Sequence, residues 1–195
     1  MKVGLTGGSG CGVSEAAKWL KSKGIQVISG DQLGYEALRE RSIKNLIIEA
    51  FGDDVLNENG EINRQKLGVV VFSDKDTLLQ LNRSTHPFIV DNIKNRASKI
   101  EHEHGIVVVD AALIFEWGLE DFFDKIIVIN APLELRIQRV MRRDEFPRET
   151  ILQRMAAQMP LEEKVKKADV VVLNDTTVDV FLGRFEEAWG GIIKV

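Results

Sequence analysis

The sequence has little of several features, and each shortage excludes a class of protein. One cysteine in 195 residues allows no internal disulfide, which fits a reducing compartment such as the cytoplasm. The apolar runs are only a few residues long, far short of a membrane span. A formal net charge of −4 argues against binding nucleic acid through bulk positive charge. The chain begins directly with a strand pattern, so no signal peptide is expected.

The composition is that of a globular enzyme, with 44% hydrophobic and 29% charged residues. This is enough for one good core with a small inserted lobe. Three short apolar runs predict buried parallel strands, and a fourth run completes a five-stranded sheet with the first strand of the chain, with helical patterns between the strands. These strands are Lys2–Thr6, Ile25–Ser29, Ile106–Asp110, Lys125–Asn130 and Val170–Leu173. The alternation predicts a doubly wound α/β fold, with helices on both faces of the sheet.

The segment between the second and third strands is too long for one crossover helix. Amphipathic helical patterns occur around Leu33–Phe51, Arg64–Phe72 and Lys75–Glu103. A turn at Asn57–Gly60 separates the first two. We therefore expect a helical lobe inserted into the α/β core.

The stretch from Val3 to Ser14, VGLTGGSGCGVS, carries the strongest chemical signal. Its layout is that of a phosphate-binding P-loop, GxxxxGK[ST], with Val13 at the position of the lysine. Glycines let backbone N–H groups surround phosphate oxygens, and the following helix adds positive charge at its N-terminus. The Ser14 hydroxyl would face Mg²⁺. A purely structural strand-to-helix turn is the alternative.

Arginines crowd the helical region 136–167, which is interrupted at Pro147 and Pro160. They are Arg136, Arg139, Arg142, Arg143, Arg148 and Arg154. One interpretation is a solvated basic helix face. The other is a mobile lid whose guanidinium groups clamp transferring phosphates.

Two aspartates follow predicted strands at the edge where α/β sheets bind ligands. Asp110 would reach Mg²⁺ through water or would cap the end of its strand. Asp31 would accept a proton from a substrate hydroxyl or would be the N-cap of the next helix. Both alternatives stay open from the residues alone.

Several segments together resemble the bacterial dephospho-coenzyme A kinase family over essentially the whole chain. They are VGLTGGSG, FGDDVLNENGEINRQKLGVVVFSD, LNRSTHP, IFEWGLE, FDKIIVINAPLELRIQRVMRRD and QRMAAQMPLEEKVKKADVVVLND. The resemblance implies transfer of the ATP γ-phosphate, with Mg²⁺, to the 3′-hydroxyl of dephospho-CoA. It also implies one P-loop kinase chain, 1–195, acting as a monomer or small homo-oligomer without nucleic acid or membrane. Its parts would be a core (1–30, 105–140 and 168–195), a CoA-binding helical lobe (31–104) and a lid (141–167).

The resemblance also implies roles for individual residues. Asp31 is the expected base for the 3′-hydroxyl, and Arg139 is the expected catalytic arginine of the lid side. Arg64 and His86 are expected to hold or shape the acceptor site, and Asp110 to hold Mg²⁺ with Ser14. The expected nucleotide-binding residues are Gly8, Gly10, Cys11, Gly12, Val13, Ser14, Glu15, Arg143 and Asn174.

The chain departs from the family pattern at Val13, at Glu15, at Ser29 and at the pair Ala111-Ala112. Loss of one preorganised cationic donor typically costs ~10²–10³ in rate, so a slower kinase is expected. Lys18, one turn further along the helix, is a weak candidate to replace the lysine. The alternatives are a catalytically weak paralogue that binds CoA or dephospho-CoA as a sensor, and a kinase for another nucleotide-like acceptor.

Cys11 lies inside the loop, near a helix N-terminus that would favour its thiolate. One interpretation is a redox-sensitive ATP site. The other is a small loop residue without chemistry of its own.

Overall fold

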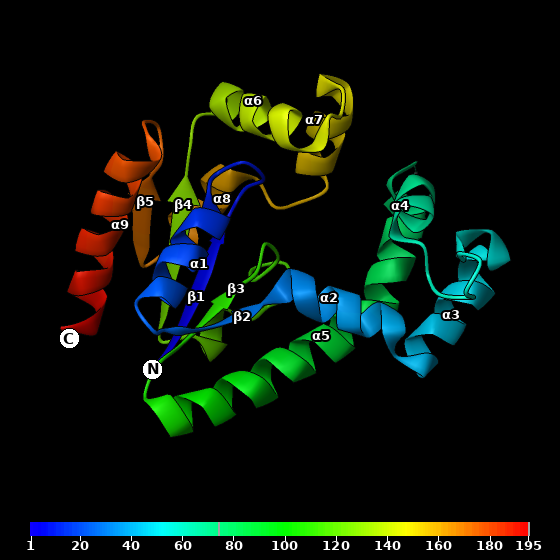
Figure 1. The fold of residues 1–195 in the computed structure, drawn as a ribbon, viewed down its shortest axis with the longest axis horizontal. Coiled ribbons are helices and arrows are strands. Elements are labelled where there is room, and N and C mark those ends of the chain that lie inside the picture. The colour runs from blue at the N-terminus through cyan, green and yellow to red at the C-terminus, as the bar shows by residue number, and fades with distance from the viewer. Residues whose placement is uncertain (74, 195) are drawn as a thin grey trace. The chain divides into compact units, whose positions relative to one another are not determined.

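The computed structural model describes residues 1–73 and 75–194. The chain divides into two compact units, one made of Met1–Ser29 with Asn95–Val195 and one of Gly30–Lys94. The first unit contains all the strands of the described chain, and the second is helical (Figure 1). The predicted CoA lobe (31–104) and lid (141–167) remain functional predictions.

The first unit is built on a five-stranded sheet in the order β2-β3-β1-β4-β5. All neighbouring strands run parallel. The strands are β1 (Lys2–Gly7), β2 (Gln26–Ser29), β3 (Val107–Asp110), β4 (Lys125–Asn130) and β5 (Val170–Leu173). The central strands are buried on both faces, as continuous apolar runs predict. The predicted α/β fold with a parallel sheet is therefore confirmed.

The register brings the carboxyl ends of the strands to one edge of the sheet. Gly7 at the end of β1 lies beside Ile129 of β4, and Asp110 at the end of β3 lies beside Leu5 of β1. The chain leaves β1 toward β2 on one side and leaves β4 toward β5 on the other. A parallel sheet has its ligand crevice where these connections diverge. In this sheet that place is the space above β1 and β4.

Helices cover the sheet and extend beyond that edge. Those of the first unit are α1 (Val13–Ser22), α6 (Leu133–Asp144), α7 (Arg148–Ala156), α8 (Leu161–Lys167) and α9 (Val178–Ile193), with a 3-10 turn η2 (Glu120–Phe122). The rings of Trp19 on α1 and Phe185 on α9 meet edge to face, with centroids 5.5 Å apart. Pro147 and Pro160 precede α7 and α8, so both predicted helix breaks are confirmed. Figure 1 shows α6 and α7 together beyond the ends of the strands.

The second unit holds α2 (Gly30–Arg39), α3 (Arg41–Phe51), the 3-10 turn η1 (Asp53–Val55) and α4 (Arg64–Ser73). It also holds the first part of α5 (Lys75–His104), which continues into the first unit. The single helix expected around Leu33–Phe51 is two helices, because Glu40 adopts an extended conformation between them. The turn at Asn57 is present, and its side-chain oxygen accepts from the amides of Asn59 and Glu61 at 3.0 and 2.9 Å.

Across the residues that the structure describes, none of the helices combines the length and the apolar character needed to cross a bilayer.

Candidate active site

The loop between β1 and α1 is the centre of the candidate site. It bends at Gly10 and Gly12, whose φ angles of 78° and 95° are accessible to glycine without strain. The Cys11 amide donates to the Gly8 carbonyl at 3.0 Å and closes the turn. Among the described residues, no side chain caps the N-terminus of α1. Its first amides are therefore available to an anion, which the helix dipole also attracts.

Two residues with expected roles at the site hydrogen-bond to this loop: Asn174, expected to bind nucleotide, and Arg139, the expected catalytic arginine. Asn174, just after β5, is buried and donates from Nδ2 to the Cys11 carbonyl at 2.8 Å. Arg139 on α6 donates to the Gly10 carbonyl at 3.3 Å, to the Asn174 carbonyl at 3.2 Å and to Asn174 Oδ1 at 3.1 Å. A Cβ at Gly12 would collide with Asn174 Nδ2, so only glycine fits there. Direct contact of either side chain with ATP stays a prediction.

Arg136, one of the six arginines named for the lid region, also reaches the loop, a contact that the sequence did not predict. The residue is 8% exposed, and its Nε donates to the Ser9 carbonyl at 3.0 Å. Its Nη2 lies where a Cβ of Gly8 would be. Arg136 and Arg139 are three residues apart and so share a helix face. That spacing is the signal by which Arg136 could have been found.

The residues expected at Mg²⁺ offer the oxygen atoms that this cation prefers. Ser14 is the second residue of α1 and is exposed, and Asp110 ends β3. Within the described chain, no group of three His, Cys, Asp or Glu side chains could hold a metal by itself. A Mg²⁺ ion held here would therefore need phosphate oxygens and water as further ligands, which is its usual mode in kinases.

A buried ion pair lies beside the same edge of the sheet. Lys164 on α8 is fully buried, and its Nζ contacts Glu116 Oε1 at 3.0 Å and the Ala112 carbonyl at 2.5 Å. The hydroxyl of Thr6 donates to the same carbonyl at 3.3 Å. These contacts fix the segment after β3 to α8 and to β1. Lys164 therefore has a structural role in this arrangement.

Lys18 does not stand free to replace the missing lysine. Its Nζ pairs with Glu15 Oε1 at 2.7 Å, and 71% of its side chain is exposed. The pair offsets the negative charge that Glu15 brings to the first turn of α1.

Cys11 is fully buried, and burial raises the pKa of its thiol above the ordinary value. The charge of Arg136 lowers the pKa, but by less. The thiolate that a helix N-terminus would favour is therefore disfavoured here. The structure supports the interpretation of Cys11 as a small loop residue.

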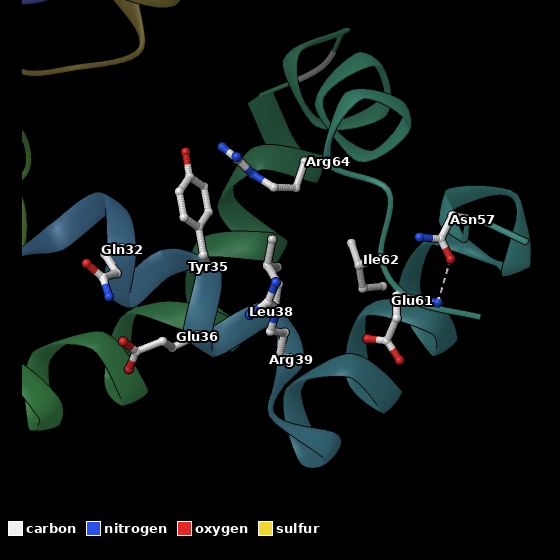
Figure 2. Close-up of a pocket in the computed structure, with 9 residues that line it drawn as sticks. All are labelled: Gln32, Tyr35, Glu36, Leu38, Arg39, Asn57, Glu61, Ile62 and Arg64. Atoms are coloured by element: carbon white, nitrogen blue, oxygen red, sulfur yellow. Dashed lines mark hydrogen bonds between the residues drawn. The ribbon is translucent and has the colours of Figure 1, made fainter. Parts of the chain in front are cut away.

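The second unit contains a pocket of about 720 Å³, a size typical of small-molecule sites (Figure 2). It is lined by Gln32, Tyr35, Glu36, Leu38, Arg39, Asn57, Glu61, Ile62 and Arg64. Figure 2 shows the Arg64 and Tyr35 side chains together, and the guanidinium carbon lies 3.6 Å from the centroid of the ring. The pocket therefore combines a stacked aromatic ring with two arginines. Sequence reasoning identified Arg64 but missed Tyr35 and Arg39.

The other expected site residues take different positions. Asp31 is exposed and lies inside the first turn of α2, so it is not the N-cap residue. His86 is half-buried on α5 and is not one of the residues that line the described pocket. Arg143 lies at the end of α6, where its guanidinium pairs with Asp144 at 2.7 Å.

A parallel sheet, a glycine loop that leads into a helix N-terminus, and arginines over that loop define a P-loop protein of the kinase type. The family model described as dephospho-CoA kinase matches residues 1–179. The chain belongs to this family.

Individual relatives agree along the whole length. A dephospho-CoA kinase of Fusobacterium nucleatum is 34% identical over 186 residues, which is 95% of each chain. One of Bacillus licheniformis is 37% identical over 197 residues, or 98% of each chain. The solved structure of the dephospho-CoA kinase from Campylobacter jejuni superposes with a TM-score of 0.75 at 31% identity, covering 100% of this chain and 98% of that one.

Proposed function

We propose that the protein transfers the γ-phosphoryl group of ATP to the 3′-hydroxyl of dephospho-CoA. The observation that carries the proposal is the full-length match to this kinase family, together with a phosphate loop in the expected place. Phosphoryl transfer needs little covalent chemistry from the protein, because positioning and charge stabilisation supply most of the catalysis.

The donor would bind at the loop of the first unit. The uncapped amides at the start of α1 would donate to phosphate oxygens, and Arg139 would keep the loop in shape for them. Ser14 and Asp110 would hold Mg²⁺, which neutralises charge on the transferring phosphate. We assign Arg143, whose side chain is 62% exposed, to the lid side of the nucleotide.

The acceptor would bind in the helical unit. The pocket of about 720 Å³ offers a stacked pair, Arg64 with Tyr35, and a second arginine, Arg39. Guanidinium groups suit the diphosphate of dephospho-CoA, and aromatic faces suit flat or apolar groups. His86 would shape this lobe from α5 without lining the pocket.

Asp31 would accept the proton of the attacking hydroxyl. The carboxylate is exposed in the first turn of α2, where negative charge is favoured. In-line transfer requires that this hydroxyl meet the γ-phosphate in the reactive complex.

The test is phosphorylation of dephospho-CoA by the purified full chain with ATP and Mg²⁺. Asp31→Asn is expected to lower kcat by ~10²–10⁴, because the general base is lost, and to leave dephospho-CoA binding within a few-fold. Asp91→Asn is the matched control, since Asp91 is an exposed carboxylate on α5 of the same unit. No turnover by the unaltered protein, with tight dephospho-CoA binding in calorimetry, would instead favour the sensor hypothesis.

The expected reduction in rate gains no support from the comparisons. Val13 does stand at the lysine position of the P-loop pattern. The rate of phosphoryl transfer is lower only if no other cation stabilises the charge on the phosphates.

A further inference from the structure

The phosphate loop lacks a cation of its own. Val13 begins α1 where the P-loop pattern has a lysine that reaches the β- and γ-phosphates. Charge on the transferring group must nevertheless be neutralised in the transition state. A replacement must be a cation that lies at the loop and has donor groups not already engaged by hydrogen bonds or ion pairs within the protein.

Three cations in the described part of the chain fail this requirement. Lys18 pairs with Glu15 at 2.7 Å and extends into solvent. Lys164 pairs with Glu116 at 3.0 Å. Arg139 uses both terminal nitrogens on the oxygens of Gly10 and Asn174.

Arg136 meets it. The residue is more than nine-tenths buried, and it contacts the loop at Ser9 through Nε and at Gly8 through Nη2. Within residues 1–73 and 75–194, neither Nη1 nor Nη2 has a hydrogen-bond or ion-pair partner. A charged guanidinium beside the loop with two unengaged terminal nitrogens provides a ready site for an anion. Its charge also reaches into the loop, where it lowers the pKa of the Cys11 thiol.

We propose that Arg136 replaces the P-loop lysine, donating from Nη1 and Nη2 to the β- and γ-phosphate oxygens of bound ATP. Gly8 is part of this arrangement, since any Cβ there would occupy the place of Nη2. The inference rests on the proposed function for its catalytic consequence, but its binding consequence is independent of the acceptor.

The test uses Arg136→Gln, Val13→Lys and the double variant. Arg136→Gln is expected to lower kcat by ~10²–10³ and to weaken ATP binding in calorimetry, because one preorganised donor is lost. Val13→Lys in that background is expected to raise kcat at least tenfold above that of Arg136→Gln, because the lysine returns a cation to the phosphates. Lys21→Gln, which removes an exposed cation in the last turn of α1, is the matched control and should stay within about twofold of the unaltered protein.

Wild-type kcat and ATP affinity in a folded Arg136→Gln would overturn the proposal, as would a double variant no faster than Arg136→Gln. If Arg136→Gln does not fold, Gly8→Ala decides. Its Cβ displaces the guanidinium, so kcat should fall, and an unchanged kcat would overturn the proposal. If the unaltered protein does not phosphorylate dephospho-CoA, the proposed function fails. The ATP affinities of the same variants then still support or refute Arg136.

Discussion

At the scale of single residues, the pKa of the Cys11 thiol depends more on burial than on the charge of nearby Arg136. Burial raises the pKa of the thiol above its ordinary value of 9.0, while Arg136 opposes the shift. Because only the thiolate reacts, the folded protein should react with a thiol reagent at pH 8 at least tenfold more slowly than the denatured chain. With one cysteine in the chain, the signal belongs to Cys11 alone. Equal rates for folded and denatured protein would contradict the burial.

The same raised pKa has a consequence for stability. Above pH 9.0 the unfolded thiol loses its proton first, while the folded thiol keeps it. The unfolded state then binds fewer protons, so the free energy of unfolding falls as the pH rises, by at most ~1.4 kcal/mol per pH unit. Urea unfolding between pH 8 and 10 measures this slope, which Cys11→Ala should reduce.

Lys164 is the residue whose loss should cost the most stability near the site. Lys164→Met leaves the Glu116 carboxylate without its cation, and we expect a loss of ~3–5 kcal/mol in urea unfolding. Adding Glu116→Gln, which removes the charge and keeps an acceptor for the Met159 amide, should recover part of it. Lys167→Met on the same helix breaks a partly exposed pair with Glu120 and a cation–π contact with Phe115, and should cost only ~1 kcal/mol. Equal losses for the two lysines would refute the assignment.

At the scale of elements, α7 depends on a small core that it shares with α6. Ile151 is 1% exposed and packs with Ile137 and Val140. Ile151→Ala should destabilise this packing by ~2–5 kcal/mol. Because the packing is local, amide exchange should accelerate across residues 148–156 and stay unchanged in β1 and β4. Leu152→Ala, at a position 37% exposed, is the control and should have little effect.

The elements themselves were largely readable from the sequence. Lys125–Asn130 and Val170–Leu173 match the observed strands residue for residue, because both are short runs of mostly β-branched apolar residues. Only Lys125–Asn130 is a buried strand, since Val170–Leu173 lies at the edge of the sheet and exposes Val171 and Leu173. The break between α2 and α3 was missed, since no proline or glycine marks it. The break is visible in the sequence only as a change in the spacing of the buried apolar residues. Leu33 and Ala37 are four residues apart, as are Ile43 and Ile47, but six separate Ala37 from Ile43, which one helical face does not allow.

At the scale of the whole molecule, the sequence predicted the candidate site only where its residues form a recognisable motif. Glycine spacing identified the loop around Gly10, because backbone geometry dictates that residue. The contact of Arg136 with the loop and the Tyr35–Arg64 pair were not predicted, because they depend on where helices place a side chain. Arg64 itself was found only through the family resemblance. Apart from the three-residue spacing of Arg136 and Arg139, tertiary contacts of this kind leave no local pattern in a sequence.

At the scale of the whole molecule, the proposed function assigns ATP to the first unit and dephospho-CoA to the second, so each ligand should protect the amides of its own unit from exchange. ATP alone should slow amide exchange around residues 8–16, and dephospho-CoA alone should slow it around residues 32–39 and 57–65, where the pocket lies. At a ligand concentration of 100 times Kd, protection should approach ~100-fold, since binding stabilises only the closed backbone.

Arg64→Gln separates the two ligands. Loss of the guanidinium over Tyr35 should abolish the protection of residues 32–39 by dephospho-CoA and raise its KM by about tenfold or more, with the KM for ATP unchanged. Lys94→Gln, an exposed cation on α5 of the same unit, is the charge-matched control and should bind both ligands normally. If Arg64→Gln instead weakened ATP protection of residues 8–16, the pocket would not be the acceptor site. The helical unit would then have to serve the nucleotide, and the separation of donor from acceptor would be wrong.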